Sequence, residues 1–312
     1  MSYHLVVIGE VLVELSSTEP LRDGVALRLA FSGDALNAAA AAAAAGARVA
    51  LLTRVADDEL GERLVERVVA LGVDTALVRR VPGQNGVYFV AADPSGQREF
   101  VYVRRGSAAS TLEPADVEAA DVGAAGAVLA SGVTCAISAT AQAAVRLAAA
   151  KARRFAYDPN YRPRLTTAAD AGRVLAGLAP HAALVTPACP GESGALLGLV
   201  DPAAVARACR DLGAAAVAVT CGADGALVDD GHSVTTLAGL PPPELVDQTG
   251  AGDVFAGTVV ARWVLGDPLV EAARLATAAA SLSLAGRGGT GRIPSLEESR
   301  AHLRRAAGEA VR

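Results

Sequence analysis

The stretch DQTGAGDVFAG, from Asp247 to Gly257, places three glycines and two aspartates ahead of an apolar run. Gly250 and Gly252 let the backbone approach a ligand without a Cβ atom in the way. The first free N–H groups of the helix that follows point at such a ligand, and the helix dipole adds to their attraction for an anion. Asp253 lies in the first turn, where we expect these N–H groups and the dipole to keep its carboxylate ionised.

This loop admits two interpretations. If a substrate hydroxyl lies within reach, Asp253 takes its proton as a phosphoryl group arrives, and a base of this kind is worth about 10²–10⁴ in rate. Otherwise the stretch is an ordinary turn whose aspartate offsets the helix dipole. On these residues alone the two interpretations have equal weight, so the rest of the chain has to decide between them.

The chain around this loop alternates strands with helices. Residues 5–9 and 49–55 are short apolar runs that suit strands buried on both faces, whereas 34–47 and 57–72 have helical composition and carry a glycine near their ends. Further candidate strands, each near an alanine-rich segment, lie at 128–131, 155–158, 183–186 and 216–220. We expect an α/β fold in three α/β/α layers, with a mostly parallel central sheet and right-handed crossovers.

Two segments depart from this alternation. Residues 84–106 contain two alternating β segments around DPSG (93–96), which is turn chemistry, and they predict an antiparallel hairpin. Residues 13–32 also alternate loosely, around the turn PLRDG. Together the two segments predict a small β-sheet lid. The α/β core is then made of residues 1–12, 33–83 and 107–312.

Composition argues against several classes of function. The net charge of −5 disfavours a nucleic-acid partner, which needs a basic face. The four cysteines and four histidines fall in no metal-binding spacing, and we expect the cysteines to be small buried residues in a reducing compartment. The N-terminal apolar run contains two glutamates and predicts a strand rather than a signal peptide. Polar residues interrupt 122–145, so we expect strand, loop and helix start there, no membrane span, and a cytoplasmic protein.

The single lysine of the chain excludes other chemistries. Lys151 lies in AAAKARRF, so a P-loop lysine is impossible. It is also the only possible nucleophile of a Schiff-base aldolase, and it lies among charged residues on a helix that we expect to be exposed. GRGGTG (286–291) matches GxGxxG, but it follows a helical segment near the C-terminus, which argues against a Rossmann dehydrogenase.

The opening stretch resembles the C-terminal signature D-T-x-G-A-G-D of the ribokinase-like (PfkB) sugar kinases, with Gln248 where threonine is commonest. The resemblance implies the ribokinase-like fold and a kinase that uses ATP and Mg²⁺, with a monovalent cation such as K⁺ as a further candidate. It makes Asp253 the catalytic base and Asp247 a support for the metal. The anion hole is implied at the amides of Gly250, Ala251 and Gly252.

Other motifs of the family follow in the same order along the chain. SGDALNAAAAAAAAGARVALLTRVADDELG (32–61) is similar to the N-terminal signature, although Ser32 and Ala56 replace common glycines. Its implied sugar-contacting residues are Gly33, Asp34 and Asn37. TCGADGALV (220–228) resembles the nucleotide-side turn of the family. The residues implied to bind the nucleotide are Thr220, Gly222, Gly225, Gly250 and Gly252, with Gly288 and Gly289 beside the adenine.

The segment GESGALLG (191–198) fits the start of a family helix at which Glu192 helps to organise Mg²⁺. The asparagine that usually stands three residues earlier is Cys189 here, which leaves the role of this segment open. The departure keeps a second class of function in view, a non-catalytic sugar or nucleotide sensor on a kinase frame. The intact Asp253 argues against that alternative.

The lid and one core loop contain the candidates for sugar recognition. VYVRRGSAAS (101–110) and DPNYRPRL (158–165) resemble the 2-keto-3-deoxygluconate kinase branch of the family, whereas fructokinases and ribokinases share the rest of the frame. An acidic sugar needs a cation for its carboxylate, and arginine can pair with it bidentately. The implied ligands of a sugar acid are Gly33, Tyr88, Tyr102, Arg104 and Arg162, and Arg105 is a further candidate.

Each of these side chains also has a plain structural interpretation. Hairpin arginines usually face solvent, tyrosines in alternating strands usually pack, and Arg162 can form an ion pair with Asp158. Tyr88, Tyr102 and Arg104 share one parity, so they lie on the same face of the lid if the hairpin has no bulge. The exposed edges of such a lid need cover, which predicts a homodimer through the lids.

Overall fold

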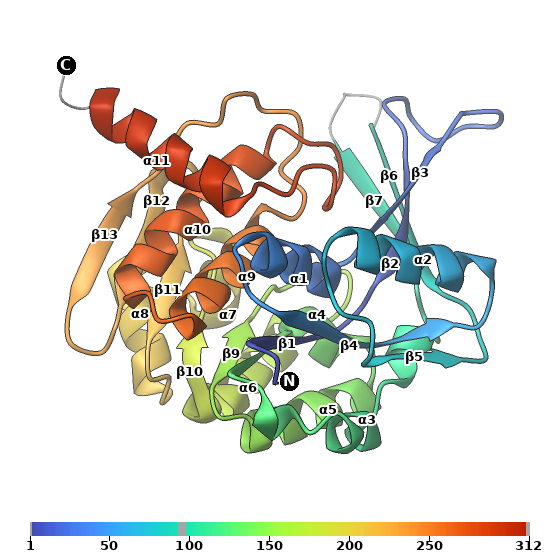
Figure 1. The fold of residues 1–312 in the computed structure, drawn as a ribbon, viewed down its shortest axis with the longest axis horizontal. Helices are drawn as coiled ribbons and strands as arrows, with labels where there is room; N and C mark the ends of the chain where they lie inside the picture. The colour runs from blue at the N-terminus through green and yellow to red at the C-terminus, as the bar shows by residue number, and fades with distance from the viewer. Residues whose placement is uncertain (1, 93–97, 310–312) are drawn as a thin grey trace.

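The structure is a computed structural model that describes residues 2–92 and 98–309. Figure 1 shows a large twisted sheet with helices on both faces and a smaller sheet at one side. The DPSG turn expected at 93–96 lies outside the described residues. In the described part of the chain, every helix is too short or too polar to span a membrane.

The central sheet has the strand order β13-β12-β11-β10-β9-β8-β1-β4-β5. Neighbouring strands run parallel, except that β12 is antiparallel to both β11 and β13. The strands are β1 Leu5–Ile8, β4 Val49–Ala56, β5 Val78–Val81, β8 Ala127–Ser131, β9 Phe155–Asp158, β10 Ala182–Val185, β11 Val217–Thr220, β12 Gly225–Asp229 and β13 Val234–Ala238. All six core strands expected from the sequence are confirmed, with ends that differ by no more than about one residue, which is within the scatter of boundary assignment.

Successive residues of the buried strands point alternately into two hydrophobic cores. Leu5 and Val7 of β1 pack on one face of the sheet, and Val6 and Ile8 pack on the other. The first core lies under α1 Asp34–Ala44, α2 Glu59–Ala70, α9 Ala251–Val264 and α10 Leu269–Ser283. The second lies under α3 Pro114–Ala119, α5 Ala139–Lys151, α6 Ala168–Leu178 and α8 Pro202–Asp211. The expected three layers are therefore confirmed.

The remaining helices are short or peripheral. They are α4 Gly132–Ile137, α7 Gly191–Leu197 and α11 Leu296–Glu309, with 3₁₀ turns η1 Ala108–Thr111, η2 Val122–Ala124, η3 Ala179–His181 and η4 Gly222–Asp224. The uncharged stretch 122–145 is divided among a 3₁₀ turn, β8, α4 and the start of α5. Its interruption by polar residues therefore correctly indicated several short elements.

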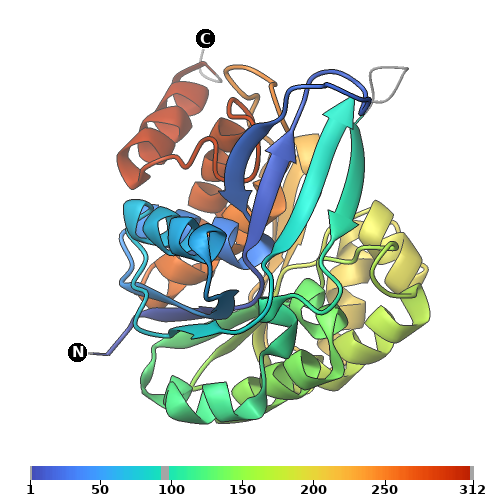
Figure 2. The same cartoon turned by 90° about the vertical axis from the view of Figure 1, so that its right-hand side faces the viewer.

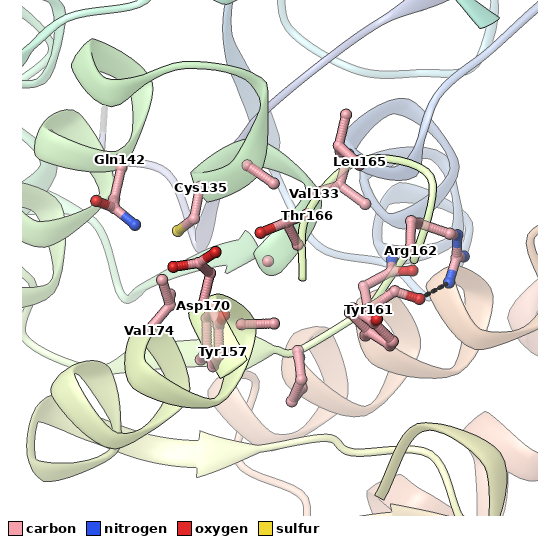
Figure 3. Close-up of a pocket in the computed structure, with 15 residues that line it drawn as sticks. Val133, Cys135, Gln142, Tyr157, Tyr161, Arg162, Leu165, Thr166, Asp170 and Val174 are labelled. Atoms are coloured by element: carbon pink, nitrogen blue, oxygen red, sulfur yellow. Dashed lines mark hydrogen bonds between the residues drawn. The ribbon is translucent and has the colours of Figure 1, made fainter. Parts of the chain in front are cut away.

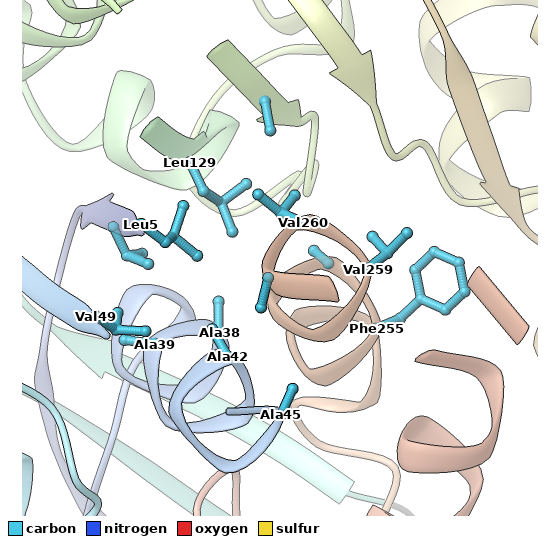
Figure 4. Close-up of a cluster of buried hydrophobic side chains, with 14 of the residues drawn as sticks. Leu5, Ala38, Ala39, Ala42, Ala45, Val49, Leu129, Phe255, Val259 and Val260 are labelled. Carbon is cyan, nitrogen blue, oxygen red and sulfur yellow. The ribbon is translucent and has the colours of Figure 1, made fainter. Parts of the chain in front are cut away.

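The alanine-rich helix α1 packs closely against α9. A Cβ atom added at Gly257 of α9 would lie 2.0 Å from the carbonyl oxygen of Ala38 in α1. Figure 4 shows alanine side chains such as Ala38 and Ala42 between the two helices. Small residues allow the backbones to approach this closely, and the approach fixes the position of α9 and of the glycine loop at its start.

Gly257→Ala is expected to lower the free energy of unfolding by about 1–3 kcal/mol, because overpacking at a tight contact forces backbone shifts. Denaturant unfolding followed by circular dichroism measures the change. Gly177→Ala is the matched control, since Gly177 lies in α6 with open space at its Cβ position, and no loss is expected there. Equal losses in the two variants would contradict the tight α1–α9 contact.

The smaller sheet stands beside the core, as Figure 2 shows. Its strand order is β3-β2-β6-β7, and the strands are β2 Leu12–Ser16, β3 Arg28–Ser32, β6 Gly86–Ala92 and β7 Arg98–Val103. β6 and β7 form the expected antiparallel hairpin, β2 pairs antiparallel with β3, and β2 runs parallel to β6. The strands occupy the two segments expected for the lid, and the division of the chain into lid and core remains a prediction.

Candidate active site

A cavity of about 400 Å³ lies where the carboxyl ends of β9, β10 and β11 meet the lid. Asp158, Thr186 and Thr220 line it from these strand ends, and Phe100 and Tyr102 line it from the lid. The glycine loop before α9 forms a further wall. Open α/β sheets bind ligands outside the carboxyl ends of their parallel strands, so this cavity is the candidate active site.

The glycine loop enters α9 through Gly250, which caps the helix with a left-handed φ of 83°. Asp247 fixes the loop, because its carboxylate accepts the N–H of Thr249 at 2.8 Å and the N–H of Gly288 at 2.7 Å. The first amides of α9 are thereby held at the cavity wall, where the helix dipole favours an anion. Asp247 thus has a clear structural role, and its support of a metal remains a prediction.

Asp253 lies in the first turn of α9, is almost fully buried, and faces the cavity. The side-chain amide of Asn37 donates to its Oδ2 at 2.8 Å, and that of Asn160 donates to its Oδ1 at 2.9 Å. One donor lies in α1, and the other lies in the loop that follows β9. They fix the plane of the carboxylate, and each oxygen keeps further acceptor capacity.

Burial raises the pKa of Asp253 to about 6, the nearby charge of Asp34 adds to the rise, and Asn37, Arg162 and Asn160 oppose it. Desolvation of the charged form therefore outweighs these hydrogen bonds, although the pKa stays low enough for the expected ionised carboxylate at neutral pH. A carboxylate with this pKa is ionised at neutral pH and accepts a proton more readily than an ordinary aspartate.

The start of α1 brings its three candidate residues close to this base. A Cβ atom at Gly33, where φ is 125°, would lie 2.5 Å from the carbonyl oxygen of Glu10, so glycine is required there. Asp34 accepts the hydroxyl of Ser131 at 2.5 Å and acts on Asp253 through its charge. Asn37 contacts Asp253 directly. Contact of these residues with a sugar remains a prediction.

The two lid tyrosines face each other across the hairpin. Tyr88 pairs directly with Tyr102 in the ladder, without a bulge, and their ring centroids are 5.9 Å apart. The guanidinium of Arg104 lies 4.3 Å from the centre of the Tyr102 ring. The expected common face is therefore confirmed for these three side chains.

Two buried glutamates, which the sequence analysis did not place in the site, contact this face. Glu10 pairs with Arg104 at 2.8 Å, and Glu14 accepts the hydroxyl of Tyr88. Burial, more than any other cause, raises the pKa of Glu10 to about 7. Since Arg104 already has a carboxylate partner, its availability to a substrate carboxylate is reduced. The available signal was a pair of glutamates within the otherwise apolar N-terminal run.

Arg162 lies in the loop after β9 and lines the cavity with an exposed guanidinium. Its Nη1 donates to the carbonyl oxygen of Tyr161 at 3.1 Å. Among the described residues it forms no ion pair with Asp158, so the structural alternative considered for Arg162 is not observed. A cation that forms no ion pair with the described residues therefore faces the same cavity as Asp253, whose pKa its charge lowers.

Residues 2–296 match the sequence profile of the pfkB family carbohydrate kinases. The chain belongs to this family. A 2-dehydro-3-deoxygluconokinase of Thermoproteus tenax is 36% identical over 302 residues, which cover 95% of this chain and 92% of that protein. A 2-dehydro-3-deoxygalactonokinase of Haloferax volcanii is 28% identical over 90% of this chain and 91% of its own. The crystal structure of fructokinase with bound ATP from Xylella fastidiosa has a TM-score of 0.85 at 21% identity, covers 97% of this chain and 99% of its own, and supports the fold alone.

Glu192 and Asp158 line the part of the cavity where Mg²⁺ is expected in this pfkB family kinase. Glu192 accepts the N–H of Tyr161 at 2.6 Å and that of Ala188 at 2.9 Å. Asp158 has no hydrogen-bond partner among the described side chains and amides. Burial, and then the charges of Glu192 and Asp253, raise the pKa of Asp158. Asp158 was not expected in the site from the sequence, although the motif DPNYRPRL (158–165) begins with it.

The turn between β11 and β12 has the backbone that its glycines suggested. Gly222 and Gly225 have left-handed φ values of 58° and 99°, and a Cβ atom at Gly225 would lie 2.2 Å from the carbonyl oxygen of Leu237. Thr220 ends β11 and lines the cavity. The turn is therefore positioned for a ligand at the strand ends, and its contact with a nucleotide remains a prediction.

Gly288 and Gly289 lie against two lid residues, Glu14 and Ser32. A Cβ atom at Gly288 would lie 2.3 Å from Oε1 of Glu14, and one at Gly289 would lie 2.3 Å from the hydroxyl of Ser32. Both glycines therefore pack against the lid, and Gly289 also lies next to Gly250 of the glycine loop. Their place beside an adenine remains a prediction.

Cys189 is buried and precedes Pro190 through a cis peptide bond. Its Sγ lies 3.2 Å from the carbonyl oxygen of Val200. It lies just before α7, the helix that contains Glu192. All four cysteines are free, and Cys135, Cys189 and Cys209 are buried as expected, whereas Cys221 is only half-buried. The cytoplasmic location remains a prediction.

Proposed function

We propose that the protein transfers the γ-phosphate of ATP to a hydroxyl of a small sugar acid, converting 2-keto-3-deoxygluconate (2-dehydro-3-deoxygluconate) into its 6-phosphate. The observation that supports this best is a single cavity lined by a buried carboxylate, a helix start and a guanidinium that forms no ion pair with the described residues, which are Asp253, Gly250 and Arg162. Membership in a carbohydrate kinase family and the 36% identical gluconokinase relative support the same reaction.

In this mechanism Asp253 takes the proton of the terminal hydroxyl as that oxygen attacks the γ-phosphate. The amides of Asn37 and Asn160 hold the carboxylate in one plane, so that the proton has a fixed acceptor. The N–H groups of residues 250–252 face the charge that grows on the phosphoryl group. The base and the anion hole belong to one helix turn, which fixes their relative positions.

The residues around Glu192 fit a divalent cation. Glu192 and Asp158 present carboxylate oxygens to the same cavity, and oxygen ligands suit Mg²⁺. Within the described residues no group of three or more acidic, histidine or cysteine side chains is placed so that it could hold a metal ion by itself. Mg²⁺ usually keeps several water molecules and binds through one or two carboxylates and the substrate phosphates. Bound Mg²⁺ would offset the negative charge of the phosphate groups. Glu192 and Asp247 would support it, and a requirement for K⁺ remains a prediction.

Arg162 distinguishes an acidic from a neutral sugar in this proposal. Its guanidinium forms no ion pair with a carboxylate among the described residues and lines the same cavity as Tyr102 of the lid and Asp253. Pairing with a sugar carboxylate satisfies this cation and orients the substrate with its far end toward Asp253. Arg104, held by Glu10 over Tyr102, shapes the lid side of the site.

A panel of sugars tests the substrate class. ADP release is measured with ATP, Mg²⁺ and 2-keto-3-deoxygluconate, 2-keto-3-deoxygalactonate, fructose, ribose or a nucleoside. We expect the two keto acids to give the highest kcat/KM. A preference for fructose or ribose would overturn the sugar-acid assignment, and ATP binding without transfer to any sugar would support a sensor.

We also infer a homodimer that forms through the lids. On the lid face opposite the tyrosines, Leu29, Val101 and Val103 are 50%, 39% and 60% exposed. Such a row of apolar side chains on a small sheet is a suitable interface. Phe100 and Tyr102, on the other face of β7, line the cavity.

Val103→Asp is expected to convert the dimer into a monomer, because it places a charge in the proposed interface. Light scattering coupled to size-exclusion chromatography measures the mass. Val234→Asp is the matched control, since Val234 is similarly exposed, on the edge strand β13 of the core. A wild-type protein that is a monomer would contradict the lid interface. A dimer that persists in Val103→Asp but is lost in Val234→Asp would also contradict it.

A further inference from the structure

Asn160 has an uncommon backbone conformation for a residue with a side chain. Its φ is 41°, in the left-handed region, and in the described chain only Asp121 shares this among residues other than glycine. Asparagine tolerates this region better than most residues. Asn160 is also 7% exposed, although it follows a strand and opens a loop.

The side chain and the backbone of this residue serve two different carboxylates. The side-chain Nδ2 donates to Oδ1 of Asp253 at 2.9 Å. The N–H of the next residue, Tyr161, donates to Oε2 of Glu192 at 2.6 Å. The turn at Asn160 sets the direction of the Tyr161 N–H. Asn160 therefore links Asp253, the proposed base, to Glu192, the carboxylate proposed to support Mg²⁺.

A small cavity lies beside the loop that contains Asn160. It has a volume of about 40 Å³ and is lined, among others, by Cys135, Tyr157 and Arg162. Figure 3 shows these side chains around the space, with Arg162 directed back to the Tyr161 carbonyl. Next to this cavity, the hydrogen bonds to Asp253 and Glu192 tie the loop to α9 and α7.

We propose that Asn160 is a positioning residue with two separable roles: its side-chain amide orients Asp253 and favours its charged form, and its left-handed backbone delivers the Tyr161 N–H to Glu192. The proposal rests on the proposed function, because the roles of Asp253 as base and of Glu192 beside Mg²⁺ belong to it. The geometry of the two contacts supports the proposal independently of the sugar.

The charges around Asp253 determine the expected pH effect. Asp34 of α1 and Asp158 of β9 are acidic neighbours, whereas Arg162 is a cation that faces it. Burial and Asp34 raise the pKa of Asp253, and the amides of Asn37 and Asn160 lower it. Loss of the Asn160 amide therefore raises this pKa, and the acid limb of the kcat profile moves to higher pH.

Asn160→Gly separates the two roles, because glycine adopts the left-handed conformation and lacks the amide. We expect kcat to fall roughly 10-fold or more, the acid limb to move upward, and the affinity for ATP in the presence of Mg²⁺ to stay at the wild-type value. A ¹³C NMR titration of the Asp253 carboxyl, assigned with Asp253→Asn, reads the pKa without turnover. A wild-type titration curve in Asn160→Gly overturns the side-chain role.

Asn160→Ala removes the amide and also disfavours the left-handed backbone. We expect the same pH effect, together with a several-fold weaker Mg²⁺-dependent binding of ATP, measured by calorimetry. Equal ATP affinity in the alanine and glycine variants overturns the backbone role. Melting temperatures identify an alanine variant that has lost the fold, and the glycine variant keeps the side-chain role testable in that case.

Asn160→Asp keeps the shape and the tolerance for a left-handed backbone but replaces the donor with a carboxylate. A second negative charge beside Asp253 is expected to raise its pKa by about one pH unit or more, beyond the effect of glycine. A smaller shift than in Asn160→Gly contradicts the direct contact. If the wild type phosphorylates no sugar, the proposed function fails, whereas the NMR titrations still decide the role of Asn160.

Discussion

Asp253→Asn is expected to lower kcat for phosphoryl transfer by about 10²–10⁴, because an amide cannot take the proton of the attacking hydroxyl. The measurement is steady-state ADP release at saturating ATP and 2-keto-3-deoxygluconate. It is made well above pH 6, where the wild-type carboxylate, whose pKa is raised to about 6, is ionised. The KM values are expected to change much less than kcat, since the base acts mainly in the transition state.

A control on structure accompanies this variant. Two amides, those of Asn37 and Asn160, donate to the Asp253 carboxylate, and an asparagine there leaves one of them facing another N–H group. The melting temperature and the calorimetric affinity for ATP therefore have to stay near the wild-type values. A stable variant that binds ATP and still turns over at the wild-type rate would show that Asp253 is not the base.

Arg162→Ala is expected to lower kcat/KM for 2-keto-3-deoxygluconate roughly 10- to 100-fold, the size of a lost hydrogen bond to a charged group. The loss for fructose or ribose, which have no carboxylate, should be small by comparison. The ratio of kcat/KM for acidic and neutral sugars measures the effect. Arg105→Ala is the matched control, because Arg105 is an exposed lid arginine outside the cavity lining, and no change is expected.

An equal loss on acidic and neutral sugars would contradict the carboxylate role of Arg162. Such a result has a physical alternative, since the positive charge of Arg162 also lowers the pKa of Asp253. In that case the acid limb of kcat moves to higher pH with every sugar. A specific loss on acidic sugars with an unchanged pH profile supports direct pairing.

The elements that local sequence determines were predictable. The buried strand β1 was visible as a continuous apolar run, because alternate residues enter two cores. Gly250 and Asp253 were visible because a glycine turn and a helix start have a local chemical pattern. The common face of Tyr88 and Tyr102 followed from the period of two along a strand.

The features that depend on distant contacts were not predictable in this way. Asn160 and Asp253 are 93 residues apart, and Glu10 and Arg104 are 94 residues apart, so no local pattern joins either pair. The rise of the Asp253 pKa was not predictable because burial depends on the packing of the whole domain. The ion pair of Arg104 was missed for the same reason, since its partner Glu10 lies in the distant segment between β1 and β2.

The most direct test of the account is ³¹P NMR of one complete reaction with ATP, Mg²⁺ and 2-keto-3-deoxygluconate. We expect ATP to be converted to ADP with an equal amount of a new phosphomonoester, whose signal is split by two methylene protons, as phosphorylation at C6 requires. The product should be absent, or appear far more slowly, with Asp253→Asn. Inorganic phosphate in place of a sugar phosphate, or a signal split by a single proton, would contradict the account.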